Sequence, residues 1–138
     1  MKSKSIAALR EECAVLLQKY VRLKAADSNG YCACWTCGKS DHWKEMQGGH
    51  FIERGKTATK LMEENVHPQC RSCNMYGMKK ASVVLAYRSA MVDFYGEAFV
   101  SELEMKASEV TKHSRQYLEE YKADIKTKIK ELECELKA

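Results

Sequence analysis

The sequence is organised around two cysteine clusters, CACWTCG at residues 32–38 and CRSCN at residues 70–74. Each cluster contains a CxxC pair, and a two-residue gap lets both sulfurs of a tight turn point at one metal ion. Two such turns complete a tetrahedron of thiolates, for which zinc is the best-suited ion. We therefore predict a structural zinc site with four ligands, Cys34, Cys37, Cys70 and Cys73.

The cysteine pattern leaves one competing assignment. Cys32 and Cys34 form a second close pair that could replace Cys34 and Cys37, although Gly38 favours the latter because a permissive residue is often needed after a metal-binding turn. The odd total of seven cysteines and the absence of an export signal argue against disulfides. Ribbons, RING modules and rubredoxin-like knuckles also use four thiolates, so this site alone does not define a function.

Composition predicts one soluble, helix-rich domain. The chain has 138 residues, 45% hydrophobic and 30% charged, with a single proline. No apolar run is long enough to cross a membrane, and the first residues are too charged for a signal peptide. We expect a cytoplasmic protein. The net charge is +4, positive up to residue 95 and negative afterwards, so the first two thirds could face a polyanion.

Hydrophobic periodicity predicts a mostly helical α+β fold. A heptad-like stripe from Ile6 to Leu23 predicts a helix over about 5–26, capped by Ser3 or Ser5. Residues 31–70 lack a helical period and predict a small hairpin around 49–52 and 65–66. Helical periodicity returns up to Gly96, and a last long helix is predicted over about 98–136. We thus expect a single domain, with an N-terminal helix in 1–30, a core in 31–95 and a C-terminal helix in 96–138.

The residues between and after the cysteine pairs resemble a nuclease motif. His50 after Gly49, then Asn65, then Asn74 directly after Cys73 follow the order of the ββα-metal (HNH, or His-Me finger) nucleases. The junction resolvases of the endonuclease VII type are similar in having a CxxCN sequence. A closer resemblance, over almost the whole length of the chain, is to the NinG (Rap) recombination endonucleases of lambdoid phages. A phage-encoded protein of this kind would act in the cytoplasm of a bacterial host cell.

This resemblance implies a metal-dependent endonuclease that cuts branched recombination intermediates such as Holliday junctions, D-loops and forks. His50 would be the general base, a role that suits imidazole near neutral pH. Asn74 would hold a catalytic Mg²⁺ or Mn²⁺ through its carbonyl oxygen. Asn65 would fix the loop that carries the base, unless it is an ordinary turn residue. His67 would bind the catalytic ion or a phosphate, or else face solvent from a strand.

The sequence departs from the broad nuclease pattern at two positions. Gly49 occupies the place where many of these enzymes have an acidic metal ligand, and Gly77 replaces a frequent lysine. The other ligands of the catalytic ion are therefore open, with Asp41, Glu45 and Glu53 as candidates. Basic residues around the motif are predicted to contact DNA phosphates, namely Arg54, Lys56, Lys60, Arg71, Lys79 and Lys80.

Three alternatives remain at the level of the sequence. The chain could be a non-catalytic zinc-ribbon module that binds DNA, or a general or site-specific HNH endonuclease. Because a four-way junction needs two symmetric cuts, the resolvase hypothesis also predicts a homodimer. Its candidate interfaces are the stripes Ile6–Leu23 and Leu118–Leu136, although these two helices could instead pair within one chain.

Overall fold

The structure is a computed structural model that describes residues 4–137. Helices predominate and are accompanied by two small antiparallel sheets, as expected for a helix-rich α+β fold. The helices and strands are, in chain order, α1 (Ile6–Ala25), β1 (Tyr31–Ala33), β2 (Ser40–His42), β3 (Gln47–His50), α2 (Thr57–Lys60), β4 (Val66–Gln69), α3 (Ala81–Tyr95), α4 (Glu97–Lys106) and α5 (Arg115–Lys137).

Helix α1 begins and ends as the sequence predicts. Ser5 caps its start, because its Oγ accepts a hydrogen bond of 3.1 Å from the N–H of Ala8; Ser3 lies outside the described residues. After the helix, the Asp27 carboxylate accepts hydrogen bonds from the N–H groups of Asn29 and Tyr31. This turn leads the chain directly into β1.

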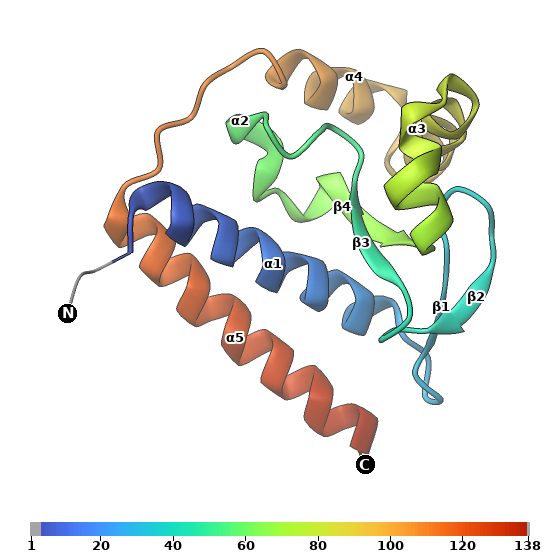
Figure 1. Cartoon of the computed structure of the whole chain (residues 1–138), viewed down its shortest axis with the longest axis horizontal. Coiled ribbons are helices and arrows are strands. Elements are labelled where there is room, and N and C mark those ends of the chain that lie inside the picture. Colours follow the sequence, from blue (N-terminus) through green and yellow to red (C-terminus); the bar gives the residue numbers. More distant parts are fainter. Residues whose placement is uncertain (1–3, 138) are drawn as a thin grey trace.

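Helices α1 and α5 pack side by side along their length (Figure 1). Leu9, Cys13 and Ala14 of α1 form one apolar cluster with Leu118 of α5, and Leu17 and Val21 form a second with Ile125 and Ile129. Both predicted stripes are therefore used within the chain. Of the two possibilities that the sequence leaves open, the structure shows the pairing of these helices within one chain, so a dimer would need a different surface.

The β3–β4 hairpin lies against α1. Its register pairs Gly49 with His67 and His50 with Val66, and the side chain of Val66 joins the α1–α5 cluster. Since neighbouring positions of a strand face opposite sides of a sheet, His50 and His67 lie on different faces of the hairpin. The predicted hairpin is confirmed.

The C-terminal part differs from the prediction of one helix over 98–136. Two helices, α4 and α5, are separated by residues 107–114. The N–H of Thr111 donates a hydrogen bond of 2.9 Å to Thr57 Oγ1, and Ser114 Oγ accepts one of 3.1 Å from the N–H of Tyr117. These bonds anchor the linker to α2 and start α5 with a new capping residue, so the long helix is broken.

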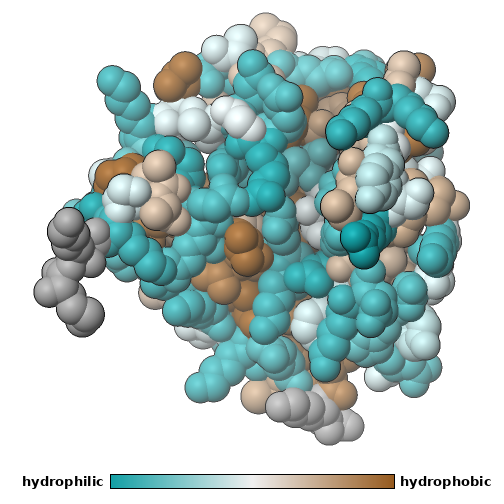
Figure 2. All heavy atoms as spheres, viewed as in Figure 1, coloured by the Kyte–Doolittle hydropathy of each residue, from teal (hydrophilic) through white to brown (hydrophobic). Residues whose placement is uncertain are grey.

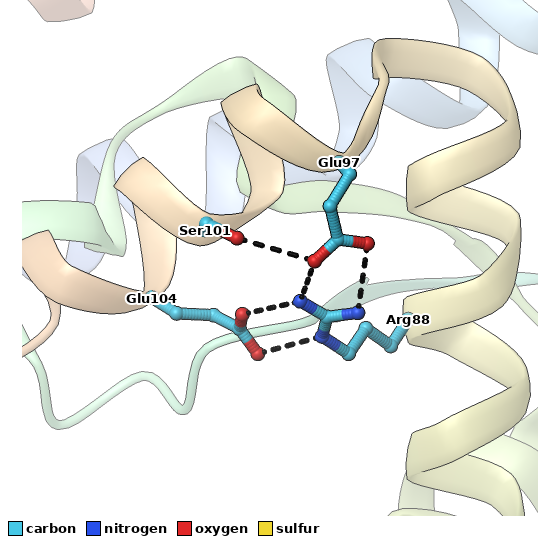
Figure 3. A network of polar contacts seen from close by, with 4 residues as sticks. All are labelled: Arg88, Glu97, Ser101 and Glu104. Atoms are coloured by element: carbon cyan, nitrogen blue, oxygen red, sulfur yellow. Dashed lines mark hydrogen bonds and ion pairs between the residues drawn. The ribbon is translucent and has the colours of Figure 1, made fainter.

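Helix α4 is attached to α3 by a polar network (Figure 3). Arg88 of α3 donates hydrogen bonds to Glu97 at 2.7 Å and to Glu104 at 2.9 Å, and Ser101 donates a third bond to Glu97. Tyr87 and Met91 of α3 also pack with Val100 and Leu103 of α4.

Hydrophilic side chains cover most of the face of the molecule seen in Figure 2.

Candidate functional site

The two cysteine clusters meet where the β1–β2 turn approaches the end of β4. The Sγ atoms of Cys34, Cys37, Cys70 and Cys73 all lie within 4.8 Å of one another, and those of Cys37 and Cys70 are 3.7 Å apart. Four thiolates bound to one tetrahedral zinc ion are roughly 3.8 Å apart, given Zn–S bonds of about 2.3 Å. The predicted four-cysteine group is confirmed as a site that could bind a metal such as zinc.

The structure also decides between the two cysteine pairings. Cys32 is outside the group of four and packs in β1 beside Met46. Gly38 adopts a φ of +78°, and its N–H donates a hydrogen bond of 2.9 Å to the carbonyl of Cys34. Since this backbone conformation favours glycine, Gly38 closes the turn that brings Cys34 and Cys37 together.

The surroundings of Cys34 favour its thiolate. Burial raises the pKa of this thiol, but hydrogen bonds from Thr36 Oγ1 and from nearby backbone N–H groups outweigh burial and lower the pKa to about 6. In contrast, burial and the neighbouring thiols raise the pKa of Cys73 to about 12. A cluster with such different pKa values becomes a set of four thiolates only with a cation to balance their charge.

His50 is the last residue of β3, and the Nδ1 atom of its side chain is available to accept a proton. Only 7% of its surface is exposed, and its Nε2 lies 2.9 Å from the carbonyl oxygen of Lys60. A carbonyl can only accept, so Nε2 carries the ring proton and Nδ1 carries the lone pair. Nδ1 is buried and has no hydrogen-bond partner among the described residues. Burial also lowers the pKa of His50, which keeps the ring neutral at neutral pH.

A pocket of about 260 Å³ brings His50 together with Asn74 and Glu53. Asn74 follows Cys73 in a π-helical turn, Ser72–Tyr76, so the cysteine cluster fixes its position. Its Nδ2 donates a hydrogen bond of 2.7 Å to Gln47 Oε1, which leaves Oδ1 as the oxygen free to accept or to bind a cation. The other residues that line the pocket are Gln18, Gly48, Phe51, Arg54, Met78 and Val84.

The structure explains why Gly49 replaces the frequent acidic residue. A Cβ atom at this position would lie 1.7 Å from Oε1 of Gln69, a fully buried side chain, so no larger residue fits. Glu53 brings a carboxylate to the same pocket from the loop after β3. Asp41 in β2 and Glu45 in the following turn do not line it. Of the three acidic candidates, Glu53 is therefore the one that the structure brings to His50.

Asn65 ties the loop between His50 and β4 together. It is fully buried, and its Oδ1 accepts a hydrogen bond of 2.7 Å from the N–H of Ile52. Its Nδ2 donates to the carbonyls of Ile52 at 3.0 Å and Thr59 at 3.1 Å. One side chain thus ties Ile52, just after β3, to Thr59, the neighbour of the His50 partner Lys60. This agrees with the positioning role implied by the resemblance.

Replacing Asn65 with alanine should destabilise the protein by about 2–4 kcal/mol, because three backbone groups, one of them buried and two partly buried, lose their partner. The midpoint of chemical unfolding measures this loss. Asn29→Ala is the matched control, since Asn29 lies in an exposed turn. Equal stability of the two variants would contradict the proposed loop-fixing role.

His67 lies away from this pocket. Its ring is buried on the opposite face of the hairpin and stacks on Trp35 with ring centroids 3.6 Å apart. Nδ1 lies 3.1 Å from the hydroxyl of Tyr87 and Nε2 lies 2.8 Å from that of Tyr95. Burial lowers the pKa of His67 to about 3. Both ring nitrogens are used inside an aromatic cluster, so the expectation that His67 binds the catalytic ion, a phosphate or solvent is not supported.

The predicted basic residues fall into two groups. Arg54 and Lys60 both form ion pairs with Glu11 of α1, and Lys56 lies 3.9 Å from Glu53. Arg71, Lys79 and Lys80 are exposed and, within the part of the chain that the structure describes, form no ion pair. Sequence reasoning missed Glu11, because a single acidic residue in a helix gives no sign of its distant partners.

These features define a small helix-rich α+β protein with a four-cysteine group that could bind a metal, next to a polar pocket. The family model of the bacteriophage lambda NinG protein matches residues 1–135. The chain belongs to the NinG family. Neither a curated protein nor a solved structure matches it. No helix among the described residues is both long and apolar enough to span a membrane.

Proposed function

We propose that this NinG-family chain is a metal-dependent endonuclease that cuts branched DNA by hydrolysis of phosphodiester bonds. The observation that supports this best is the state of His50. Its Nε2 is held by the Lys60 carbonyl, its Nδ1 is free and buried, and it shares a pocket with Asn74 and Glu53. A neutral imidazole in a fixed orientation, next to oxygen ligands, is what the activation of water requires.

In this proposal, Nδ1 of His50 takes a proton from a water molecule, and the oxygen of that water attacks the phosphorus. The bond from phosphorus to the 3′ oxygen breaks, and that oxygen takes a proton from solvent water, which leaves 5′-phosphate and 3′-hydroxyl ends. The hydrogen bond from Nε2 to Lys60 stabilises the ring as it becomes positively charged. Asn65 acts through this loop and is a positioning residue.

Two metal ions belong to the proposal. Asn74 Oδ1 and the Glu53 carboxylate are oxygen ligands of the kind that Mg²⁺ and Mn²⁺ prefer, and such an ion would stabilise the charge on the leaving oxygen. The four cysteines would hold a structural zinc ion, which suits their spacing. This second site would fix the turn that carries Asn74.

The direct test is to incubate the purified protein with four-way, forked and linear duplex DNA, with and without Mg²⁺ or Mn²⁺. We expect cleavage only with the metal ion, and faster cleavage of the branched substrates. Binding without cleavage under every condition would favour a zinc-ribbon DNA-binding module. Equal cleavage of linear and branched DNA would favour a general HNH endonuclease.

Glu11 restrains the cations beside the pocket. Replacing it with glutamine frees Arg54 and Lys60 for phosphate, so we expect affinity for DNA to rise by roughly 3- to 10-fold at low salt. Glu12→Gln is a matched control, because it makes the same change in net charge but frees Lys4 and Lys122 instead. Binding titrations in EDTA measure the effect. An equal rise in both variants would show a general effect of charge rather than release of these two residues.

A further inference from the structure

A second hollow, of about 460 Å³ and with both polar and apolar lining residues, lies beside the linker between α4 and α5. Figure 1 shows this linker passing α2 and the start of α1. The hydrogen bond from the Thr111 N–H to Thr57 Oγ1 fixes the linker to α2. Among the described residues, no acidic side chain lines the hollow. Its lining residues are Ala58, Leu61, Met62, Lys106, Thr111, Lys112, His113, Ser114 and Tyr117.

The polar groups of this hollow are mainly donors and cations. Lys106 and Lys112 are exposed and form no ion pair with any described residue. Arg10 Nε donates a hydrogen bond of 2.9 Å to Nδ1 of His113. Since Nδ1 accepts, Nε2 of His113 carries a proton and is itself a donor. The negative balance of residues 96–138 arises elsewhere, because residues 106–115 contain only Glu109 against Lys106, Lys112 and Arg115.

The hollow is joined to the proposed active site through α2 and α1. Ala58 and Leu61 line the hollow, whereas the carbonyl of Lys60, between them, holds His50. On α1, Arg10 contacts His113 and the next residue, Glu11, pairs with Arg54 of the His50 pocket. Burial lowers the pKa of Lys60, and the nearby charges of Arg54 and Arg10 lower it further, as expected for cations in one group.

We infer that this hollow binds a phosphate group of the DNA backbone, on a strand that continues from the pocket of His50. The inference rests on the proposed function and extends it to a surface formed by Arg10, Lys106, Lys112 and His113. Lysines without an ion-pair partner among the described residues, together with neutral donors in a hollow that no described carboxylate lines, match a polyanion. Contacts of this kind give affinity that is independent of base sequence. Nuclease substrates with branches offer such backbone segments on more than one side of the cut.

The test compares the double variant Lys106→Gln/Lys112→Gln with the matched control Lys126→Gln/Lys130→Gln. The control removes the same charge from exposed positions further along α5. Binding of a labelled four-way junction is measured by fluorescence anisotropy in EDTA across a salt series, after thermal unfolding has shown that both variants are folded. Cleavage by the wild type is measured separately with Mg²⁺.

We expect the Lys106/Lys112 variant to bind at least about tenfold more weakly near 0.1 M salt, and the slope of log affinity against log salt to become shallower by about 2. The control should stay near wild type. If the two double variants bind the junction with equal affinity, the inference is overturned. The same result is expected if the hollow binds an acidic protein instead of DNA. A wild type that never cleaves, together with the expected loss of binding, would refute the nuclease proposal and leave the phosphate contact standing.

Discussion

Replacing His50 with alanine is expected to reduce the cleavage of branched DNA by about 10²- to 10⁴-fold, the usual contribution of a general base. The reason is that His50 Nδ1 is a buried proton acceptor without a hydrogen-bond partner in residues 4–137, in the pocket that also holds Asn74 and Glu53. DNA affinity should stay close to wild type, because the predicted phosphate contacts come from other residues. Single-turnover cleavage with saturating protein measures the chemical step separately from binding.

Two further variants keep this test decisive. His42→Ala removes a histidine from β2, outside the pocket, and should cleave normally. His50→Gln offers an amide donor to the Lys60 carbonyl but no base, so it should fold better than the alanine variant and remain inactive. If either substitution of His50 retains cleavage within a few-fold of wild type, His50 is not the base.

The pH dependence follows from the same residue. Burial lowers the pKa of His50 below its ordinary 6.5, so the neutral, active form persists at neutral pH. The cleavage rate should be flat near pH 7 and fall only as the pH decreases through that lowered pKa. The free energy of unfolding should also fall on acidification, because of a second histidine, His67. The unfolded chain protonates His67 near pH 6.5, whereas the folded chain does so only near its pKa of about 3. Unfolding must therefore be measured at each pH, and a rate that increases on acidification would contradict the assignment.

The sequence predicted the parts of the fold that rest on local patterns. The CxxC pairs identified all four members of the cysteine group, and Ser5 and residues 27–30 marked the ends of α1. The stripe from Leu118 to Leu136 identified α5. In each case the signal is a spacing or a capping residue, which acts within a few residues of itself.

The break between α4 and α5 could not be predicted in the same way. It depends on a hydrogen bond from Thr111 to Thr57, a residue far away in the sequence. The buried face of α1 was also predicted too narrowly, since Leu17 and Val21 are more buried than Leu16 and Tyr20. Helix α1 contacts the β3–β4 hairpin as well as α5, and a single periodic stripe describes only one of these partners.

In the candidate site, too, local patterns were predictable and features that depend on distant contacts were not. His50, Asn65 and Asn74 were found from their order around the cysteines, and the structure gives each a defined environment. The place of His67 was not predictable, because it depends on the strand register that pairs it with Gly49. Slipping the register by one residue would turn His67 to the other face of the hairpin.

The cysteine group leads to the largest expected effect on stability. Replacing Cys70 with serine should remove the bound zinc and abolish cooperative unfolding. A structural zinc site contributes about 10–16 kcal/mol in zinc-finger peptides, whereas the net stability of a domain is about 5–15 kcal/mol. Elemental analysis of protein purified without chelator, together with thermal unfolding, measures both changes. We expect one zinc per wild-type chain.

Cys134→Ser and Cys32→Ser are the matched controls for this substitution. Cys134 is exposed on α5, and Cys32 is buried in β1 but outside the group of four. Both variants should keep their zinc, so loss of zinc from Cys32→Ser would return Cys32 to the ligand set. Wild-type protein without zinc, or a Cys70→Ser variant with normal zinc content, would overturn the proposed structural site.

Mild EDTA treatment should separate the two proposed ions. Four thiolates hold zinc tightly, whereas Asn74 and Glu53 offer only two oxygen ligands to Mg²⁺ and leave the rest of its coordination to water. Cleavage should therefore stop in EDTA and return when Mg²⁺ or Mn²⁺ is added, while the zinc content and the unfolding temperature stay unchanged. Recovery of cleavage only after zinc is added would show that zinc is the required ion and contradict the proposed catalytic role of Mg²⁺ or Mn²⁺.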